Sequence, residues 1–165
     1  MEAIHKWTSE GRLSQMAAER IERWLTDSAF AEFRGEILDL IRSEDIDELE
    51  DSFRTQIVFG TGGIRGKMGP GPNRINSRTL GEAAQGLARH ILNEVGQKQI
   101  ECGVAIANDT RVNSDRFARD TATIIAANGI TAHLFDGPRS TPELSFAVVL
   151  VQRAVAVDLK TLARF

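Results

Sequence analysis

The stretch at residues 59–66, Phe-Gly-Thr-Gly-Gly-Ile-Arg-Gly, constrains the fold more than any other part of the chain. Four glycines fall within the seven positions from Gly60 to Gly66, directly after a short apolar run at residues 56–59 that predicts a β-strand. Glycine tolerates positive φ and exposes backbone amides to a ligand, and Arg65 adds a permanently charged planar group. The pattern predicts a phosphate-binding loop, and it is equally compatible with an ordinary glycine-rich hairpin.

The glycine stretch does not match the common nucleotide-binding motifs. A P-loop requires Gly-Lys followed by Ser or Thr, whereas Lys67 is followed by Met68. A dinucleotide fingerprint requires a helix directly after the glycines, and residues 68–73 contain two prolines that prevent one. ATP and NAD are therefore disfavoured as ligands.

Length and charge restrict the class of protein. A chain of 165 residues with 42% hydrophobic and 26% charged residues suits one domain with a real core. The net charge of −3 argues against nucleic acid or an anionic membrane as a partner, and the apolar runs are far shorter than the ~20 residues of a membrane helix. Cys102 is the single cysteine, which excludes an internal disulfide. With no signal-peptide pattern, we expect a cytoplasmic protein.

The first 52 residues read as helices. Two apolar faces with helical spacing lie within residues 10–42, and Asp27 or Ser28 can cap the second helix. The first face contains Leu13, Met16, Ala17, Ile21, Trp24 and Leu25, and the second contains Phe30, Phe33, Ile37, Leu40 and Ile41. Residues 44–51 carry six acids. They could bind a divalent cation, but a solvated helix face is the preferred interpretation because no glycine interrupts them.

From residue 79 the pattern alternates between helix and strand. Thr79 and Glu82 match a capping box, residues 103–107 and 130–135 read as strands, and Ser114 can cap the helix between them. Thr141 can cap a further helix with Pro142 in its first turn. This order predicts a parallel α/β unit, in which residues 108–111 and 137–141 follow strand ends and meet the glycine stretch at one edge.

Asp109 and Arg111 follow the first of these strands. Asp109 is expected to order the loop through bonds to nearby backbone groups, and Arg111 is expected to face phosphate. A helix-capping or surface salt-bridge role for Arg111 is equally compatible with the sequence.

Further motifs follow the glycine stretch in a fixed order. They are Lys67–Gly69, Gly71–Asn76, Gln85–Ala88, Ala107–Arg111 and Ser140–Ala147. With residues 59–66 and the helix around Trp24, they make the chain resemble the first domain of the α-D-phosphohexomutase superfamily, especially its phosphoglucomutase/phosphopentomutase branch. The resemblance extends to about Val148. It implies an α/β fold with a three-layer α/β/α mixed sheet, incomplete, and a helical N-terminal extension.

The resemblance also implies a reaction and its site. Enzymes of this superfamily transfer a phosphoryl group between two hydroxyls of a sugar, using a phosphoserine, magnesium and a sugar bis-phosphate activator. On that template Arg65 is the expected catalytic residue, beside the phosphoserine position. The expected phosphate- or substrate-binding residues are Thr61, Gly62, Gly63, Arg65 and Arg111. Asp109 and Thr141 are the expected loop scaffold, and no metal ligand is expected in this chain.

The end of the chain departs from the superfamily pattern. There a strand and a serine loop follow the helix at residue 141, whereas residues 149–165 contain no Ser-His-Asn. We therefore expect a helical extension at 1–52, a partial first domain at 53–148 that lacks the catalytic strand, and a divergent tail at 149–165 caused by truncation or a reading-frame shift. The loss of a strand predicts an exposed sheet edge near Val104 and Ile106, with self-association through it.

The resemblance thus predicts one domain of an enzyme for intramolecular phosphoryl transfer on hexose or pentose phosphates. The expected ligand is a sugar phosphate or inorganic phosphate, and the isolated chain is expected to be inactive because it lacks the catalytic serine. A non-enzymatic phosphate-binding or subunit-pairing module is the alternative.

Overall fold

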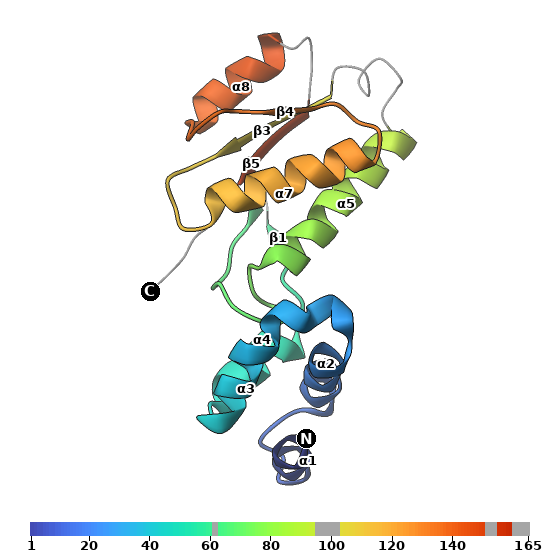
Figure 1. The fold of residues 1–165 in the computed structure, drawn as a ribbon, viewed down its shortest axis with the longest axis vertical. Coiled ribbons are helices and arrows are strands. Elements are labelled where there is room, and N and C mark those ends of the chain that lie inside the picture. The colour runs from blue at the N-terminus through green and yellow to red at the C-terminus, as the bar shows by residue number, and fades with distance from the viewer. Residues whose placement is uncertain (61–62, 95–102, 151–154, 160–165) are drawn as a thin grey trace. The chain divides into compact units, whose positions relative to one another are not determined.

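A computed structural model describes residues 1–60, 63–94, 103–150 and 155–159 of the chain (Figure 1). The chain divides into two compact units, one from Met1 to Asn76 and one that begins at Ser77. The positions of the parts relative to one another are not determined, so each unit is described by itself. The family domain predicted at 53–148 spans parts of both units, and its boundaries stay a prediction.

The first unit begins with a series of helices. They are α1 (Glu2–Ser9), α2 (Gln15–Thr26), the 3-10 helix η1 (Ser28–Phe33), α3 (Arg34–Arg42) and α4 (Ile46–Arg54). Ser14 caps α2 by accepting a hydrogen bond from the Ala17 amide (3.2 Å), and Asp27 caps η1 through the Ala29 amide (2.9 Å). The two helices predicted within residues 10–42 are confirmed, the second as η1 followed by α3; α1 lies within the helical extension predicted at 1–52, although no separate helix was predicted before residue 10.

Aromatic side chains fill the core of this unit. The Trp24 ring stacks on Phe30 at 4.5 Å between centroids and meets Phe53 edge-on at 5.5 Å. Met16, predicted for the buried face of α2, is 50% exposed. The buried face centres on Ala17, Ile21 and Trp24. Met16 directly precedes Ala17, and one step along a helix rotates the side chain by about 100°, which moves Met16 off that face.

The second unit alternates helices with parallel strands. Its elements are α5 (Ser77–Glu94), β3 (Val104–Asn108), α7 (Ser114–Ala127), β4 (Ala132–Leu134), α8 (Thr141–Leu150) and β5 (Val155–Leu159). The strand order is β4-β3-β5, and Val104 lies opposite Ala132 on one side and Val155 on the other. The parallel α/β unit predicted from the alternation is confirmed.

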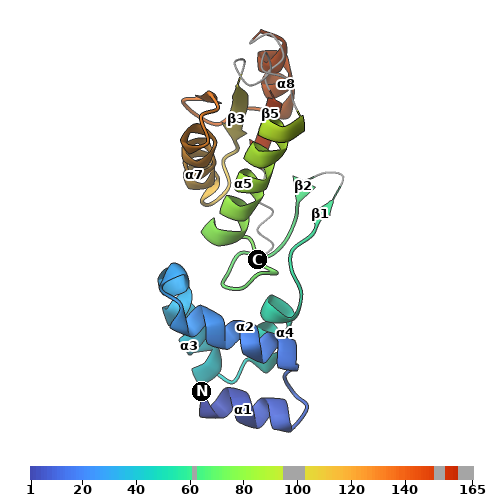
Figure 2. The same ribbon diagram turned by 90° about the vertical axis from the view of Figure 1, so that its right-hand side faces the viewer.

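Helices cover both faces of this sheet. Val104 and Ile106 of β3 pack in one apolar cluster with buried residues of α5 and α7. Ala105 and Ala107 pack against Leu144 of α8 on the opposite face. Figures 1 and 2 both show the sheet between α8 and α7. Because successive side chains of a strand point to opposite faces, β3 supplies both halves of the core, and the three-layer α/β/α fold is confirmed.

The strand expected to be missing is present. Residues 155–159 form β5, directly after α8 along the chain, and pair with the whole of β3. The predicted exposed edge near Val104 and Ile106 is therefore wrong, since β3 is the central strand and both side chains are fully buried. The physical reason is that a buried strand needs partners for its backbone groups on both sides.

Helix α5 begins earlier than the capping-box pattern indicated. It starts at Ser77, so Thr79 lies inside its first turn and is buried. Glu82 pairs with Arg78, with 2.6 Å between carboxylate oxygen and Nε. Cys102 lies outside the described residues. No helix in the described part of the chain is long and apolar enough to cross a membrane.

Candidate functional site

The glycine stretch forms a short antiparallel hairpin (Figure 2). Strand β1 (Phe59–Gly60) pairs with β2 (Gly63–Ile64), and Phe59 lies opposite Ile64. The strand predicted at residues 56–59 is wrong before Phe59, because the Ile57 amide donates to the Pro72 carbonyl (2.9 Å) rather than to a strand. Two predicted site residues, Thr61 and Gly62, lie outside the described residues. The hairpin fits both sequence interpretations of this stretch.

Arg65 follows β2 directly. Its side chain is exposed, and among the described residues nothing donates to it, accepts from it or pairs with its charge. A guanidinium has five N–H donors and is always charged, so it suits planar binding of an anion with two oxygens. The position therefore leaves a cation beside a glycine hairpin with its donors available.

The loop after Arg65 lies against α4. The Asn73 amide donates to the Ser52 carbonyl (3.0 Å), and the Asn76 side-chain amide donates to the carbonyls of Gly69 and Gly71 (2.9 Å each). Gly71 has φ +111°, and a Cβ there would lie 2.6 Å from the Ser52 oxygen. Only glycine satisfies both conditions, so the close approach of the loop to α4 depends on it.

A buried arginine joins this loop to α4. Arg74 is 2% exposed, and it donates from Nε and Nη2 to one Glu48 oxygen (2.8 and 2.6 Å) and from Nη2 to Asp51 (2.6 Å). Lys67 also reaches Glu48, at 3.1 Å. Partial burial alone raises the pKa of Glu48, but hydrogen bonds and charge from Arg74 and Lys67 outweigh it and lower the pKa below its ordinary value.

This cluster corrects the interpretation of the acidic stretch. Glu48 and Asp51 do not simply form a solvated face, because both bind the Arg74 side chain. Sequence reasoning missed Arg74 as a partner. The available signal was the spacing of Glu48 and Asp51, which places two carboxylates on one face of a helix, together with an arginine in a loop.

The described residues do not fit a magnesium site. Within them, no group of three or more His, Cys, Asp or Glu side chains is arranged to hold a metal ion. Two acids of α4, Glu48 and Asp51, bind Arg74, and this fixed cation would repel a second one.

The loop after β3 is held by short-range bonds. Asp109 accepts from the Arg111 amide (3.0 Å), and its other oxygen lies 3.3 Å from Arg111 Nε. The Asp109 amide donates to Ser114 Oγ (3.1 Å). Ser114 is fully buried and is the first residue of α7, so the prediction that it caps this helix is wrong, and the N-cap position is Asn113. Arg111 is exposed but paired, unlike Arg65.

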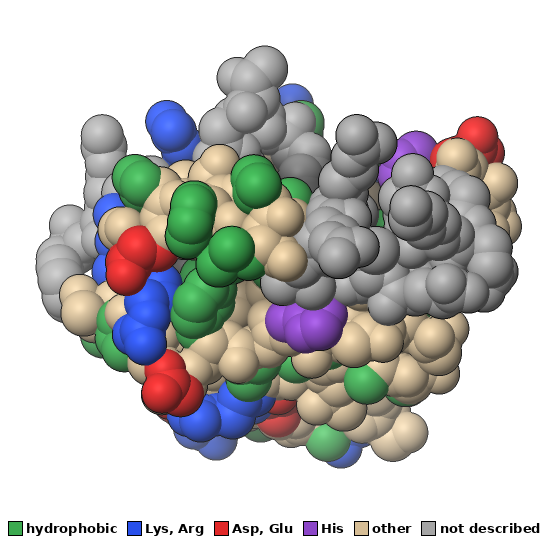
Figure 3. Space-filling model, turned by 90° about the horizontal axis from the view of Figure 1, so that it is seen from above, with side chains coloured by type: hydrophobic (Ala, Val, Ile, Leu, Met, Phe, Trp, Pro, Cys, Tyr) green, Lys and Arg blue, Asp and Glu red, His purple; other side chains and the backbone are tan. Residues whose placement is uncertain are grey.

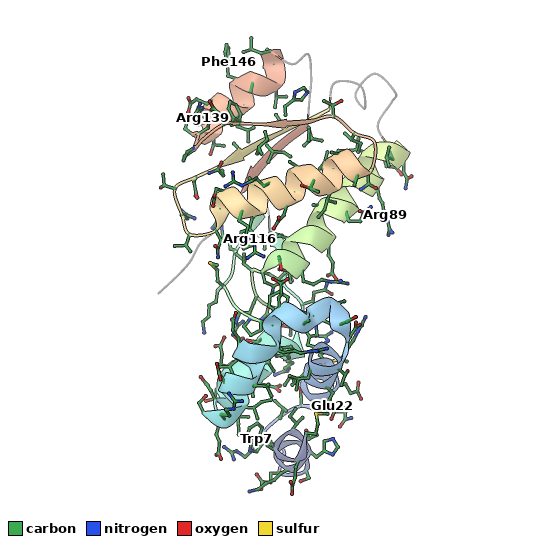
Figure 4. All side chains as sticks on the ribbon, viewed as in Figure 1. Trp7, Glu22, Arg89, Arg116, Arg139 and Phe146 are labelled. Atoms are coloured by element: carbon green, nitrogen blue, oxygen red, sulfur yellow. The ribbon has the colours of Figure 1, made fainter. Side chains whose placement is uncertain are left out.

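The loop between β4 and α8 meets the Asp109 loop. The Arg139 amide donates to the Asn108 carbonyl (2.9 Å), and its side chain, labelled in Figure 4, pairs with Asp136 (2.8 Å). Ser140, not Thr141, caps α8: it forms a capping box with Glu143, and Thr141 and Pro142 begin the helix. The Ser140 amide and hydroxyl donate to Glu143 and lower the pKa of its carboxyl.

The predicted site residues thus fall into two groups. Gly63 and Arg65 lie in the first unit, whereas Asp109, Arg111 and Thr141 lie in the second. The structure brings Asn108 and Arg139 together within the second unit. The meeting of the glycine hairpin with these loops stays a prediction.

Comparison with known proteins supports the resemblance. Residues 56–159 match the family model of phosphoglucomutase/phosphomannomutase alpha/beta/alpha domain I. A phosphoglucomutase of Staphylococcus saprophyticus subsp. saprophyticus is 39% identical over 112 residues, which cover 68% of this chain and 20% of that protein. A probable phosphoribomutase of Schizosaccharomyces pombe is 34% identical over 139 residues, which cover 84% of this chain and 24% of that protein. No solved structure matches the chain.

The match extends beyond the predicted end of the resemblance at Val148 and includes β5. The chain spans about a fifth to a quarter of the length of these curated relatives. Since the family model covers more than half of the chain and the observed α/β/α layers agree with its description, the chain belongs to the phosphoglucomutase/phosphomannomutase domain I family.

Proposed function

We propose that this chain contributes a phosphate-binding loop to a sugar-phosphate mutase, with Arg65 as the phosphate-contacting residue. The observation that carries the proposal is the exposed Arg65 guanidinium, which directly follows a glycine hairpin and has no partner among the described residues. A phosphate group supplies the paired oxygens that such a cation binds best.

The other site residues are assigned by their place in the fold. Thr61, Gly62 and Gly63 would present backbone amides to the same phosphate. Asp109 Oδ2 lies 3.3 Å from Arg111 Nε and helps to order the loop. Arg111 would release Asp109 and contact a second anionic group of the substrate. Thr141, the first residue of α8, would support the neighbouring loop.

The activity of the whole enzyme is intramolecular phosphoryl transfer on hexose or pentose phosphates. The names of the relatives, phosphoglucomutase and phosphoribomutase, support both substrate classes. Magnesium and a sugar bis-phosphate belong to the activity of that whole enzyme, which we place in the cytoplasm. The isolated chain has no mutase activity, because its sequence has no Ser-His-Asn loop to donate the phosphoryl group. Turnover of glucose 1-phosphate above a heat-treated control in a coupled assay contradicts this.

The test of the phosphate loop is a titration with inorganic phosphate and with glucose 1-phosphate, followed by amide NMR. We expect dissociation constants on the order of millimolar, with shifts centred on residues 62–66. Arg65→Lys weakens binding because it loses the planar fork, and Arg65→Ala abolishes it. Arg42→Ala is the control, since Arg42 is exposed in the same unit and pairs with Asp39. Shifts that are equal in the wild type and in Arg65→Ala disprove the assignment.

A subunit-pairing module is the second candidate, and the outer face of α8 favours it. Phe146, Val149 and Leu150 are 62%, 71% and 66% exposed. Hydrophobic side chains gather on the face seen in Figure 3, and Figure 4 marks Phe146 on α8. A second copy of the chain would bury this apolar surface. Light scattering decides: a dimer that Phe146→Asp dissociates supports pairing, and a wild-type monomer at high concentration excludes it.

A further inference from the structure

We propose that Arg74 is the positioning residue for the glycine hairpin. It holds the loop at residues 68–76 on α4, and that loop in turn holds both ends of the hairpin. The functional consequence rests on the proposed phosphate role of Arg65, whereas the mechanical part of the inference does not. All the residues involved lie in the first unit.

The first step is the attachment of the loop to α4. Arg74 uses Nε and Nη2 on Glu48 and Asp51, and its Nη1 donates to the carbonyl of Asn73 (3.0 Å) in its own loop. The Arg74 side chain is 2% exposed and that of Glu48 is 27% exposed, so this pair is screened less by water than a surface ion pair, whereas Asp51 stays 58% exposed. Lysine cannot replace it, because an ammonium lacks the fixed fork that reaches these acceptors at once.

The second step is the attachment of the hairpin to the loop. On the entering side, the Ile57 amide donates to the Pro72 carbonyl (2.9 Å) two residues before Phe59. On the leaving side, the Ile75 amide donates to the Lys67 carbonyl (2.8 Å) two residues after Arg65. Pro72 and Ile75 flank Arg74 in the sequence. Both ends of the hairpin therefore bond to the segment that Arg74 fixes.

The third step is the packing between the two ends. A Cβ at Gly66 would lie 2.9 Å from the Ile57 Cδ1 atom, so the chain leaving the hairpin passes close to the side chain of the entering segment. Arg65 has no partner of its own among the described residues, so its direction depends on these fixed points. A shift of the loop changes where its guanidinium points, and binding that requires two aligned hydrogen bonds is sensitive to that direction.

The experiment compares Arg74→Lys with the matched control Arg42→Lys, which changes an exposed arginine of the same unit. Both are studied as the full chain, at a temperature where circular dichroism shows them folded. We expect the Ile57 and Ile75 amides to exchange hydrogen at least roughly tenfold faster in Arg74→Lys, because their local opening becomes easier. We also expect phosphate to bind roughly tenfold more weakly. The control Arg42→Lys leaves the amide exchange rates and the phosphate affinity unchanged.

Two outcomes overturn the inference. In one, Arg74→Lys lowers the melting temperature but leaves the exchange of Ile57 and Ile75 and the phosphate affinity at wild-type values, as a merely structural role predicts. In the other, exchange rises evenly over the whole unit. If Arg74→Lys does not fold, Asp51→Asn replaces it, because this change removes one exposed carboxylate charge and keeps an oxygen near Nη2. Asp51→Asn is expected to change the exchange of the Ile57 and Ile75 amides and the phosphate affinity in the same direction, by a smaller factor.

Failure of the proposed function gives a different result. If wild-type protein does not bind phosphate, the loop assignment is wrong, and the exchange measurement alone decides the positioning role. If phosphate binds and Arg65→Ala abolishes it while Arg74→Lys changes nothing, the loop assignment stands and the positioning inference is wrong.

Discussion

The two arginine loops predicted to bind phosphate are held in place by different means. In the loop after β3, Asp109 bonds to the Arg111 amide two residues away and to Ser114 five residues away. Among the described residues of the glycine hairpin no side chain bonds to the nearby backbone in this way, and the loop after the hairpin is joined to α4 by Arg74, which lies 26 residues from Glu48 in the sequence. These side-chain bonds of the first loop are all local, whereas the second loop also depends on ion pairs to a helix that is distant in the sequence. Changes to remote residues should therefore disturb the hairpin far more than the Asp109 loop.

The largest expected effect tests the contact between α4 and the loop after the glycine hairpin. Gly71→Ala should lower the free energy of unfolding by about 2–5 kcal/mol, because a Cβ meets the Ser52 oxygen at 2.6 Å and φ is +111°. Gly129→Ala is the matched control, since its φ of +78° carries strain but nothing lies within 4 Å. It should cost about 1 kcal/mol. Urea unfolding measures the free energy of unfolding of both variants. Equal losses would show that the clash with the Ser52 oxygen of α4 contributes nothing.

An intermediate effect tests the local support. Ser114→Ala should lower the free energy of unfolding by about 1–3 kcal/mol, because it leaves the Asp109 amide without its acceptor next to a fully buried position. The NMR shifts should be confined to residues 108–114. The exposed Ser9→Ala serves as the control, with a loss near zero. Shifts that spread to the glycine hairpin would show that the two loops are not independent.

The smallest expected effect is a dependence on pH. The pKa of Glu48 is lowered on folding, so its contribution to stability is complete above its ordinary value of 4.5 and is lost as pH falls through the lower folded value. Wild-type protein should therefore lose stability below about pH 4.5. Glu48→Gln should be less stable at pH 7 and should lose less on acidification. Parallel pH profiles of the two proteins would contradict the role given to Glu48.

Local patterns predicted much of the fold. The apolar spacing in residues 10–42, the strand around Val104 and the helix predicted between the two strands all appear in the structure. The family resemblance rested on short motifs, and the match at residues 56–159 supports it. Caps were less accurate: Ser114 begins a helix rather than capping it, and Ser140 caps α8 in place of Thr141. Several hydroxyl residues near a helix start fit the same cap pattern equally well.

Strand β5 shows why a motif can mislead. Residues 149–165 lack the serine loop of the superfamily, and this led to the expectation that the strand was missing as well. The run Val155-Ala156-Val157 has ordinary strand character, and β3 pairs with it along its whole length. The need of a buried strand for partners on both sides is a property of the sheet, and it does not depend on a catalytic motif.

The sequence by itself determined the helices of the first unit, the alternation of helix and strand, and the family. These features depend on neighbours within a few residues, through periodicity, caps and glycine conformations. The tertiary structure decided that β3 is central, that Glu48 and Asp51 bind Arg74, and that Arg65 has no partner among the described residues. The reason is that a buried charge must find its partner in space, and the distance between Glu48 and Arg74 along the chain gives no sign of their distance of 2.6 Å in the fold.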